Sequence, residues 1–589
     1  MMNKSLRLAT MAREQPPTAA SDDARTGVHV PYAQDAFERW VLFLDTLRER
    51  ADNMIAHERQ GMPPLLDFDY ELLRDARNFE RPANYALLRI TRVGDDCWDD
   101  CVDAAKPPVI IIDPRAGHGP GIGGFKRDSE VGMAMHEGHP VYFVIFFPEP
   151  MPGQTLADVH YALRDFVSEV ARRHPDKAPV LYGNCQAGWA ATLLAADCEG
   201  LTGPVVLNGS PLSYWSGEAA SSPMRMMGAL SGGAWAAHMI SDLGDGRFDG
   251  AWLAQNFENL QPEKAIWDKY ATLFARADTE RERFLEFERW WNGYFTLSRE
   301  EILGITQNLF IGNRLEQGEM QLDAHCTVDL KRISNPLIIF ASEGDNITPP
   351  EQAMGWIAKL YPDTDALKAA GQRIVYMTHG HVGHLGIFVS GSVARIQHRA
   401  ILESLDEVDA LAPGLYEMVI DNPSGDPDCE SGDFAVRFEP REVDDLAIAS
   451  DDAALEQVAQ ISRINEAAYS TFVSPWLRVA TSPASAEALR ALHPMRWTRT
   501  MFSERVNPWM SLVKFAADTL RETRDPLPES HPAIVTERAL SARTGEVLGA
   551  WRKGRDAWIT HVFGAMFGTL PITTSPARAN HPDAVSHKE

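Results

Sequence analysis

The sequence predicts an α/β protein built on a doubly wound, mostly parallel sheet. Two runs, Pro108–Pro114 and Pro140–Pro148, are almost continuously apolar, as is typical of parallel strands covered on both faces. Similar runs recur along the chain with helical segments between them, which is the order expected for such a sheet. Around Cys185, a short apolar strand also leads through a tight turn into a helix of small residues.

The composition argues against several classes of protein. With 589 residues the chain can bury a full core and hold two or three structural units. A formal net charge of −26 disfavours nucleic acid and anionic membrane surfaces as partners. Because no run of about 18 apolar residues occurs, we expect no integral membrane segment. The cysteine usage fits a reduced, cytoplasmic compartment. The six cysteines show neither a disulfide framework nor the paired spacing of a zinc site, so no metal and no cofactor are expected.

The N-terminal part divides into two segments. Residues 1–30 are polar and are predicted to be disordered. Residues 31–82 are predicted to form a helical segment, whose apolar stripe runs from Phe37 and Trp40 to Leu47. We favour packing of this stripe on the main domain, and binding to a membrane or a polymer granule is the alternative.

Residues 83–400 are expected to hold the sheet and therefore the main domain. A helical, aromatic-rich insertion at about 211–329 interrupts the alternation of strands and helices and is predicted to form a cap, the alternative being a packing subdomain. Helices are predicted at Gly123–Gly138 and Leu156–His174, and strands at Ala83–Val93, Pro179–Tyr182, Pro204–Asn208, Pro336–Ala341 and Arg373–Met377.

The character of the chain changes after the main domain. Residues 401–450 are predicted to form a small β unit, 451–570 a mainly helical region, and 571–589 a disordered tail. Within the helical region, Arg496 and Arg499 lie among aromatic residues. An exposed basic helix face is the favoured interpretation, over contact with a phosphate or a granule.

Cys185 is the candidate nucleophile. It lies between an apolar strand and a helix, and the small residues Gly183, Ala187 and Gly188 would let the backbone turn sharply there. This pattern is typical of the nucleophile elbow of α/β-hydrolases. The helix N-terminus would favour a thiolate. The alternative is an ordinary buried cysteine in a strand-to-helix turn.

An acid and a base follow the cysteine in the order that α/β-hydrolases use. Asp345 comes directly after one apolar strand, with Glu343 as the rival acid. His379, His381 and His384 lie in the loop after the next strand, and one of them can serve as base. A metal cluster is disfavoured because this loop lacks the helical spacing and the carboxylate of common metal sites.

The oxyanion hole is predicted from two segments. One donor is the backbone N–H of Gln186, and the other comes from the glycine-rich loop after the strand at Pro108–Pro114, where Gly117 and Gly119 are the candidates. The loop matches neither a dinucleotide nor a phosphate-binding pattern. The candidate substrate-binding residues are Arg115, His118, Trp189 and His381.

Four segments, PVIIIDP, EGHPVYFVIFFPEP, LYGNCQAGWAATLLA and IIFASEGDNITPPEQA, resemble the catalytic domain of polyhydroxyalkanoate synthases. VGHLGIFVSG is closer to the histidine loop of intracellular polyhydroxyalkanoate depolymerases, which implies His384 rather than His381 as base. The whole chain resembles a bacterial family labelled domain of unknown function 3141. Ala187, Trp189 and the C-terminal region depart from the synthase pattern.

These resemblances imply an α/β-hydrolase fold and a Cys-His-Asp acyltransferase that acts on 3-hydroxyacyl thioesters, since a thiolate passes an acyl group on as a second thioester. The implied partners are acyl-CoA or a hydroxyacyl oligomer as substrate, with a polymer granule and a second copy of the chain as further candidates. A thioesterase or depolymerase with the same triad is one alternative. The other is a non-catalytic scaffold that binds acyl-CoA or granules.

Overall fold

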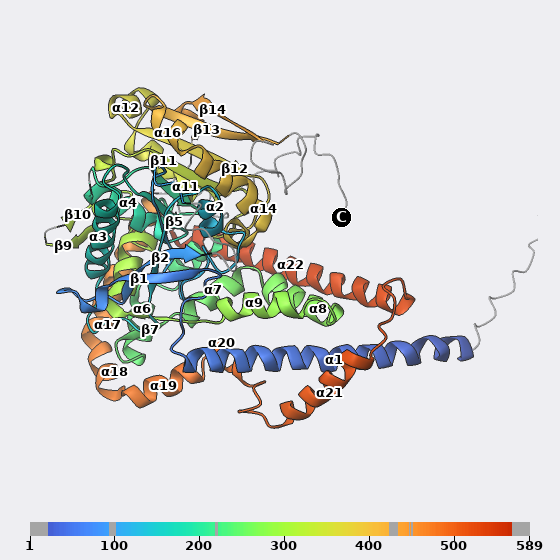
Figure 1. The fold of residues 1–589 in the computed structure, drawn as a ribbon. Coiled ribbons are helices and arrows are strands. Elements are labelled where there is room, and N and C mark those ends of the chain that lie inside the picture. The colour runs from blue at the N-terminus through green and yellow to red at the C-terminus, as the bar shows by residue number, and fades with distance from the viewer. Residues whose placement is uncertain are drawn as a thin grey trace, which may run out of the picture.

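The computed structural model describes residues 22–92, 102–198, 200–217, 222–324, 326–422, 434–446, 448 and 452–567. Its centre is a sheet with the strand order β1-β2-β4-β3-β5-β6-β11-β12-β13-β14 (Figure 1). The strands from β4 to β13 in this order pair in parallel, and antiparallel pairs close both edges. The strands are β1 (Asp69–Asp75), β2 (Tyr85–Arg92), β3 (Val109–Ile112), β4 (Val141–Phe146), β5 (Val180–Asn184), β6 (Val205–Asn208), β11 (Leu337–Ser342), β12 (Arg373–His379), β13 (Gly414–Asp421) and β14 (Ala435–Arg441).

Helices cover both faces of this sheet, which explains why the central strands are continuously apolar. Alternate residues of a strand point to opposite faces. Accordingly, Ile110 belongs to one core and Ile111 to the other. The first core includes α3 (Leu156–Arg173), α4 (Ala187–Asp197) and α11 (Pro350–Leu360), and the second includes α2 (Glu130–His136), α13 (His384–Val389) and α15 (Arg399–Glu403). A mostly parallel sheet with a strand-to-helix turn at Cys185 is the arrangement of the α/β-hydrolase fold.

A helical cap lies between β6 and β11, where the sequence predicts an insertion. A two-stranded antiparallel sheet of β7 (Arg247–Asp249) and β8 (Thr296–Ser298) joins distant parts of the cap, and β9 (Gln321–Asp323) pairs with β10 (Cys326–Thr327) near its end. Its helices are α5 (Pro223–Leu230), α6 (Trp235–Leu243), α7 (Ala251–Leu260), the π-helical turn η3 (Glu263–Asp268), α8 (Lys269–Ala275), α9 (Arg281–Trp291), α10 (Arg299–Ile305) and the π-helical turn η4 (Thr306–Phe310).

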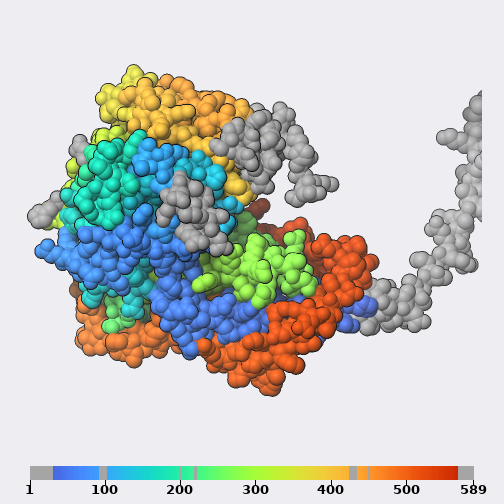
Figure 2. All heavy atoms as spheres, viewed as in Figure 1, coloured from blue at the N-terminus to red at the C-terminus, as the bar shows by residue number. Residues whose placement is uncertain are grey.

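The two ends of the chain pack together against the cap. Val41 and Leu42 of α1 (Asp22–Arg59) are buried with Ala517 of α21 (Trp509–Thr523). Figure 2 shows the N-terminal segment in blue and the C-terminal segments in orange to red side by side along the lower face. The C-terminal helices are α17 (Asp452–Phe472), α18 (Ser474–Ala480), α19 (Pro483–Ala491), α20 (Pro494–Thr500), α21 (Trp509–Thr523) and α22 (Pro532–Phe567).

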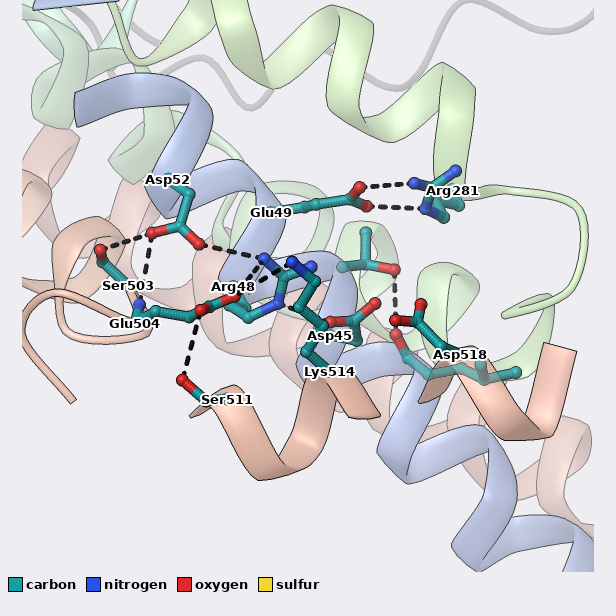
Figure 3. Close-up of polar contacts among 12 residues, drawn as sticks. Asp45, Arg48, Glu49, Asp52, Arg281, Ser503, Glu504, Ser511, Lys514 and Asp518 are labelled. Atoms are coloured by element: carbon teal, nitrogen blue, oxygen red, sulfur yellow. Dashed lines mark hydrogen bonds and ion pairs between the residues drawn. The ribbon is translucent and has the colours of Figure 1, made fainter. Parts of the chain in front are cut away.

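Ion pairs reinforce this packing (Figure 3). The Arg48 guanidinium on α1 contacts Asp45 at 2.6 Å and Glu504, which precedes α21, at 3.0 Å. Arg281 of the cap makes a two-pronged contact with Glu49. The apolar stripe of α1 is therefore mainly an internal contact, as predicted, although Phe37 and Trp40 remain exposed.

Several predictions about the chain ends are wrong. The first helix begins at Asp22, within the segment 1–30 expected to be disordered. The segment 31–82 is not all helical, because β1 lies within it; its sequence, DYELLRD, is largely polar and forms an exposed edge strand, so it lacks an apolar signal. The β unit at 401–450 is not separate, because β13 and β14 extend the central sheet.

The basic stretch of α20 is also not an exposed face. Arg496 and Arg499 are buried, and they pair with Asp249 and Glu258 of the cap. None of the described helices is both long enough and apolar enough to cross a bilayer. The predicted tail 571–589 and three of the cysteines, at positions 97, 101 and 429, lie outside the described residues.

His398 is a buried histidine with a hydrogen bond at each ring nitrogen. The Tyr182 hydroxyl donates to its Nδ1 at 2.6 Å, and its Nε2 donates to the Ile387 carbonyl at 2.8 Å, so the ring is held neutral. Burial lowers the pKa of His398 to about 4, although the bond to Ile387 opposes this. Below the ordinary pKa of about 6.5 the unfolded chain binds a proton that the folded chain does not. The free energy of unfolding therefore decreases as the pH is lowered from about 6.5 towards 4.

We expect this histidine to cost about 1.4 kcal/mol of unfolding free energy per pH unit between pH 6.5 and 4. Urea unfolding of the wild type and of His398→Asn across this range measures the difference. The variant should show the smaller pH dependence. Equal slopes for the two proteins would contradict the buried neutral histidine.

Candidate active site

Cys185 stands at a strained turn between β5 and α4. Its φ is +49°, in the left-handed region that side chains other than glycine rarely adopt. The turn requires glycine on both sides: a Cβ at Gly183 would lie 2.7 Å from the Gly188 Cα, and a Cβ at Gly188 would lie 1.9 Å from the Ser210 Oγ. The backbone N–H of Cys185 donates to the Asn208 carbonyl at 2.8 Å and fixes the turn to β6.

The strain at Cys185 can be measured. At most helix positions alanine is more stable than glycine by about 1 kcal/mol. At a positive φ this order reverses, because the Cβ is the cause of the strain. We expect Cys185→Gly to be more stable than Cys185→Ala by about 1 kcal/mol in chemical unfolding. The opposite order would mean that the turn is not strained in solution.

Cys185, His384 and Asp345 form a continuous chain of contacts. The Cys185 Sγ lies 3.1 Å from the His384 Nε2, and the His384 Nδ1 donates to the Asp345 Oδ2 at 2.6 Å. The backbone N–H groups of Ile347 and Thr348 donate to the Asp345 Oδ1, each at 2.8 Å. These bonds orient the carboxylate, and the carboxylate in turn fixes the imidazole with Nε2 toward the sulfur.

The charges around His384 favour its protonated form. Burial alone would lower the pKa of His384, but the Asp345 carboxylate and the Cys185 sulfur, by charge and hydrogen bonding, raise it well above its ordinary value. The imidazole can therefore accept a proton from the thiol and keep it. The arrangement can support a nucleophilic sulfur with an adjacent base.

The rival residues of the two loops do not reach Cys185. Glu343 is exposed, whereas Asp345 is buried. His379 uses its Nδ1 to accept the backbone N–H groups of His381 and Val382, and so shapes the loop. His381 is exposed and does not line either of the cavities at Cys185, so its predicted contact with substrate is not supported.

The glycine-rich loop lies beside Cys185, but Gly119 cannot supply the oxyanion donor that the sequence predicts. Its N–H is already bonded to the Gly293 carbonyl at 2.8 Å. Gly117 packs against the cap, where a Cβ would lie 2.5 Å from the Gly250 carbonyl oxygen. Ala116 of the same loop does line the cavity at Cys185.

Asp113, which is not among the residues predicted for the site, holds this loop in place. Its carboxylate accepts the backbone N–H of Gly121 at 2.6 Å and that of Gly123 at 3.1 Å. Burial raises the pKa of Asp113 to about 6, although these hydrogen bonds oppose the shift. The signal in the sequence was its place directly after an apolar strand, at the edge where parallel strands present functional groups.

Of three further predicted substrate-binding residues, Arg115 and Trp189 lie away from the site, whereas His118 lines it. Arg115 is buried away from the site, where its guanidinium contacts Glu301 and the Thr296 carbonyl, so it does not bind an anion. Trp189 packs in the core and lines neither cavity. His118 lines the cavity, but burial lowers its pKa to about 3, so it is neutral and offers no charge to an anion.

Two cavities meet at Cys185. The histidine-side cavity, of about 320 Å³, includes His384 in its wall, and the helix-side cavity, of about 340 Å³, includes Gln186. Cys185, Phe257 and Ile347 line both. Four aromatic side chains of the cap line the histidine-side cavity, namely Phe257, Phe287, Trp290 and Trp291. The sequence predicts an aromatic-rich cap but does not show which of its side chains lie near the sulfur.

Within the residues that the structure describes, one group of side chains away from Cys185 has the residue types of a metal site. Ligand atoms of His160, Asp197 and Cys326 lie within 4.8 Å of one another. The His160 Nε2 is already bonded to Asp197 at 2.9 Å, and Arg164 contacts the same oxygen at 3.3 Å. A metal ion would be repelled by this guanidinium, so we assign the group to structural hydrogen bonding.

The model of the family described as "Protein of unknown function (DUF3141)" matches residues 35–589. The chain belongs to this family. A Rhizobium meliloti protein described as "Uncharacterized protein in ackA 5'region" is 44% identical over 533 residues, which are 89% of this chain and 72% of that protein.

More distant similarity extends beyond this family. The poly(3-hydroxyalkanoate) polymerase subunit PhaC of Haloferax mediterranei is 24% identical over 281 residues, which are 44% of this chain and 51% of that protein. Among solved structures, carboxylesterase CesB of Bacillus subtilis covers 61% of this chain and 98% of its own, with 10% identity and a TM-score of 0.32. Est1E of Butyrivibrio proteoclasticus covers 56% of this chain and 99% of its own, with 12% identity and a TM-score of 0.31.

Proposed function

We propose that the chain is an acyl-transfer enzyme that uses Cys185 as its nucleophile on acyl thioesters. The observation that carries the proposal is the chain of contacts from the sulfur to His384 at 3.1 Å and from His384 to Asp345 at 2.6 Å. The strained turn at Cys185 adds to it, since backbone strain of this kind is common at functional residues.

The first half-reaction acylates the cysteine. His384 takes the thiol proton on Nε2, and the sulfur attacks the thioester carbonyl to form a tetrahedral intermediate. The Gln186 N–H is a suitable oxyanion donor, since the first N–H groups of a helix have no acceptor within it. When the intermediate collapses, its bond to the sulfur of the carrier breaks, and the imidazolium gives the proton it took from Cys185 to the departing thiolate.

The second half-reaction passes the acyl group on. His384 removes the proton of an acceptor hydroxyl as its oxygen attacks the acyl-cysteine. The bond between the carbonyl carbon and the Cys185 sulfur breaks, an ester forms, and the proton returns to the sulfur. Because the acyl-cysteine is itself a thioester, little energy is lost in the first step and the group remains available for transfer.

The donor that we propose is a 3-hydroxyacyl thioester of coenzyme A, and the acceptor is the hydroxyl of another hydroxyacyl group. What supports this choice is the similarity to a poly(3-hydroxyalkanoate) polymerase subunit over 281 residues. Contact with a polymer granule and formation of a homodimer stay predictions.

Product analysis tests transfer against hydrolysis. The protein is mixed with 3-hydroxybutyryl-CoA, with and without an alcohol acceptor, and free coenzyme A, free acid and ester products are quantified by mass spectrometry. We expect ester to exceed free acid when the acceptor is present. Free acid as the sole product would show that the protein is a thioesterase and not a transferase. If no coenzyme A were released, both activities would be contradicted.

Replacing Asp113 tests whether the glycine-rich loop contributes to the oxyanion hole, although its Gly119 has no free N–H. Asn in its place keeps the size of the side chain but loses one of the two oxygens that accept backbone N–H groups. We expect Asp113→Asn to lower kcat by about 10- to 100-fold with little change in KM, because the loop matters most in the transition state. A loss of activity that appears only in KM, or only alongside unfolding, would contradict this positioning role.

A further inference from the structure

The two cavities at Cys185 differ in which catalytic group they contain. The histidine-side cavity is lined by His384 and the adjacent Leu385, whereas the helix-side cavity is lined by Gln186 and Thr348. Each reaches the sulfur, so two organic groups can be bound at once on opposite sides of the same carbonyl carbon.

Proton transfer decides which group occupies which cavity. His384 must reach both the departing thiol and the incoming hydroxyl, because it gives a proton to one and takes a proton from the other. Both therefore occupy the cavity that contains His384, one after the other. The acyl chain, which exchanges no proton with His384, is left with the cavity on the Gln186 side.

We propose that the histidine-side cavity binds an anionic, phosphate-bearing thiol carrier and then the acceptor, and that the helix-side cavity binds the acyl chain. The inference rests on the proposed function and adds to it a specificity site for the carrier. Its consequence is that carrier and acceptor use the same space in turn, so the carrier leaves before the acceptor binds.

The two cavities differ in the charged groups that line them. The histidine-side wall contains two carboxylates with partners of their own: Glu258 pairs with Arg499 at 2.7 Å, and Asp113 accepts two backbone N–H groups. Lys264 lines the histidine-side cavity and is exposed, and it forms no ion pair within the described residues. Lys269 of the same wall is held by Glu288 at 2.9 Å. In a chain with a net charge of −26, an uncommitted cation at this position is suited to a phosphate group.

The helix-side cavity has no comparable cation among the residues that line it. Its arginine, Arg225, is buried and donates to the carbonyls of Ser216 and Gly217 at 2.8 and 2.9 Å. Its wall combines polar side chains such as Asn256 and Thr306 with apolar ones that can hold an alkyl chain, and the absence of an uncommitted cation among these residues, not apolarity, distinguishes it from the histidine-side cavity. Its apolar members include Met224, Met227, Leu253, Leu260, Phe310 and Ile311.

Two variants separate the cavities. Lys264→Met removes the charge and keeps the length of the side chain. Gly228→Leu adds bulk to the helix-side cavity; a Cβ at Gly228 would lie 3.5 Å from the Ile311 Cδ1, an ordinary contact, and leucine favours the helix more than glycine does. Lys177→Met is the control for charge. Lys177 is exposed and lies before the first residue of β5, whereas Cys185 follows the last residue of the same strand.

The experiment measures the rate of Cys185 acylation by mass spectrometry with four thioesters. The 3-hydroxy forms of the butyryl and dodecanoyl groups are each presented on coenzyme A and on N-acetylcysteamine, which carries no phosphate. We expect Lys264→Met to slow acylation from coenzyme A about fivefold relative to N-acetylcysteamine for both acyl groups. Gly228→Leu should slow dodecanoyl transfer at least about tenfold relative to butyryl transfer on both carriers.

The outcomes distinguish this inference from the proposed function. If Lys264→Met affects both carriers equally, or no more than Lys177→Met does, the carrier site is overturned. If Gly228→Leu discriminates between carriers rather than acyl groups, the two cavities are assigned the wrong way round. If the wild-type cysteine is acylated by none of the four thioesters, the proposed function fails and the inference fails with it.

Discussion

Replacing Cys185 by alanine is expected to reduce turnover of an acyl thioester by at least about 10³-fold and to abolish the acyl-enzyme. The sulfur is the atom that forms the bond to the acyl group in our proposal, and it contacts the Nε2 of His384, whereas the Asp345 carboxylate contacts the Nδ1 and is held by two backbone N–H groups. The measurement is kcat/KM for 3-hydroxybutyryl-CoA together with the circular dichroism spectrum of the variant.

Cys198→Ala is the matched control. Cys198 is also a buried free cysteine, but burial raises its pKa to about 11 and it packs in the core beside α4. We expect this variant to keep its activity per folded molecule, with a modest loss of stability. Comparable losses in the two variants would indicate a structural role for cysteine in general, and an active Cys185→Ala would contradict the nucleophile.

The second large effect is expected at Asp345. Asparagine there no longer stabilises the imidazolium and can hold the wrong tautomer of His384, so kcat should fall by roughly 10²- to 10⁴-fold. The pH profile should change as well. Because the carboxylate raises the pKa of His384, its loss should move the titration of the imidazolium to lower pH.

Glu343→Gln provides the comparison for this variant. It removes a carboxylate two positions away that is exposed and does not contact His384. We expect its kcat and pH profile to match the wild type. If Glu343→Gln has the larger effect, the acid of the site has been assigned to the wrong residue.

Much of the site could be predicted because the fold places it at particular points in the chain order. Cys185, Asp345 and His384 each follow a buried strand, and parallel strands end at the same edge of a sheet. The apolar runs show where the strands are, and the chain order then shows which polar residues can meet. The choice of His384 over His381 came from a resemblance, and spacing alone left it open.

The residues that sequence reasoning misplaced depend on contacts with distant segments. Arg115 turns from the site because Glu301 of the cap pairs with it, and Gly119 loses its N–H to Gly293. Trp189 faces the core because of its position on α4, which no apolar pattern distinguishes in a helix of small residues. Contacts of this kind between the loop and the cap are not encoded in local spacing.

The most direct test of the account is the intact mass of the protein after brief mixing with 3-hydroxybutyryl-CoA, followed by peptide mapping. The account predicts one added 3-hydroxybutyryl group on the wild type, located on the peptide that contains Cys185, and none on Cys185→Ala. An acyl group on another residue, or none on a Cys185 that a small alkylating reagent modifies readily, would contradict it.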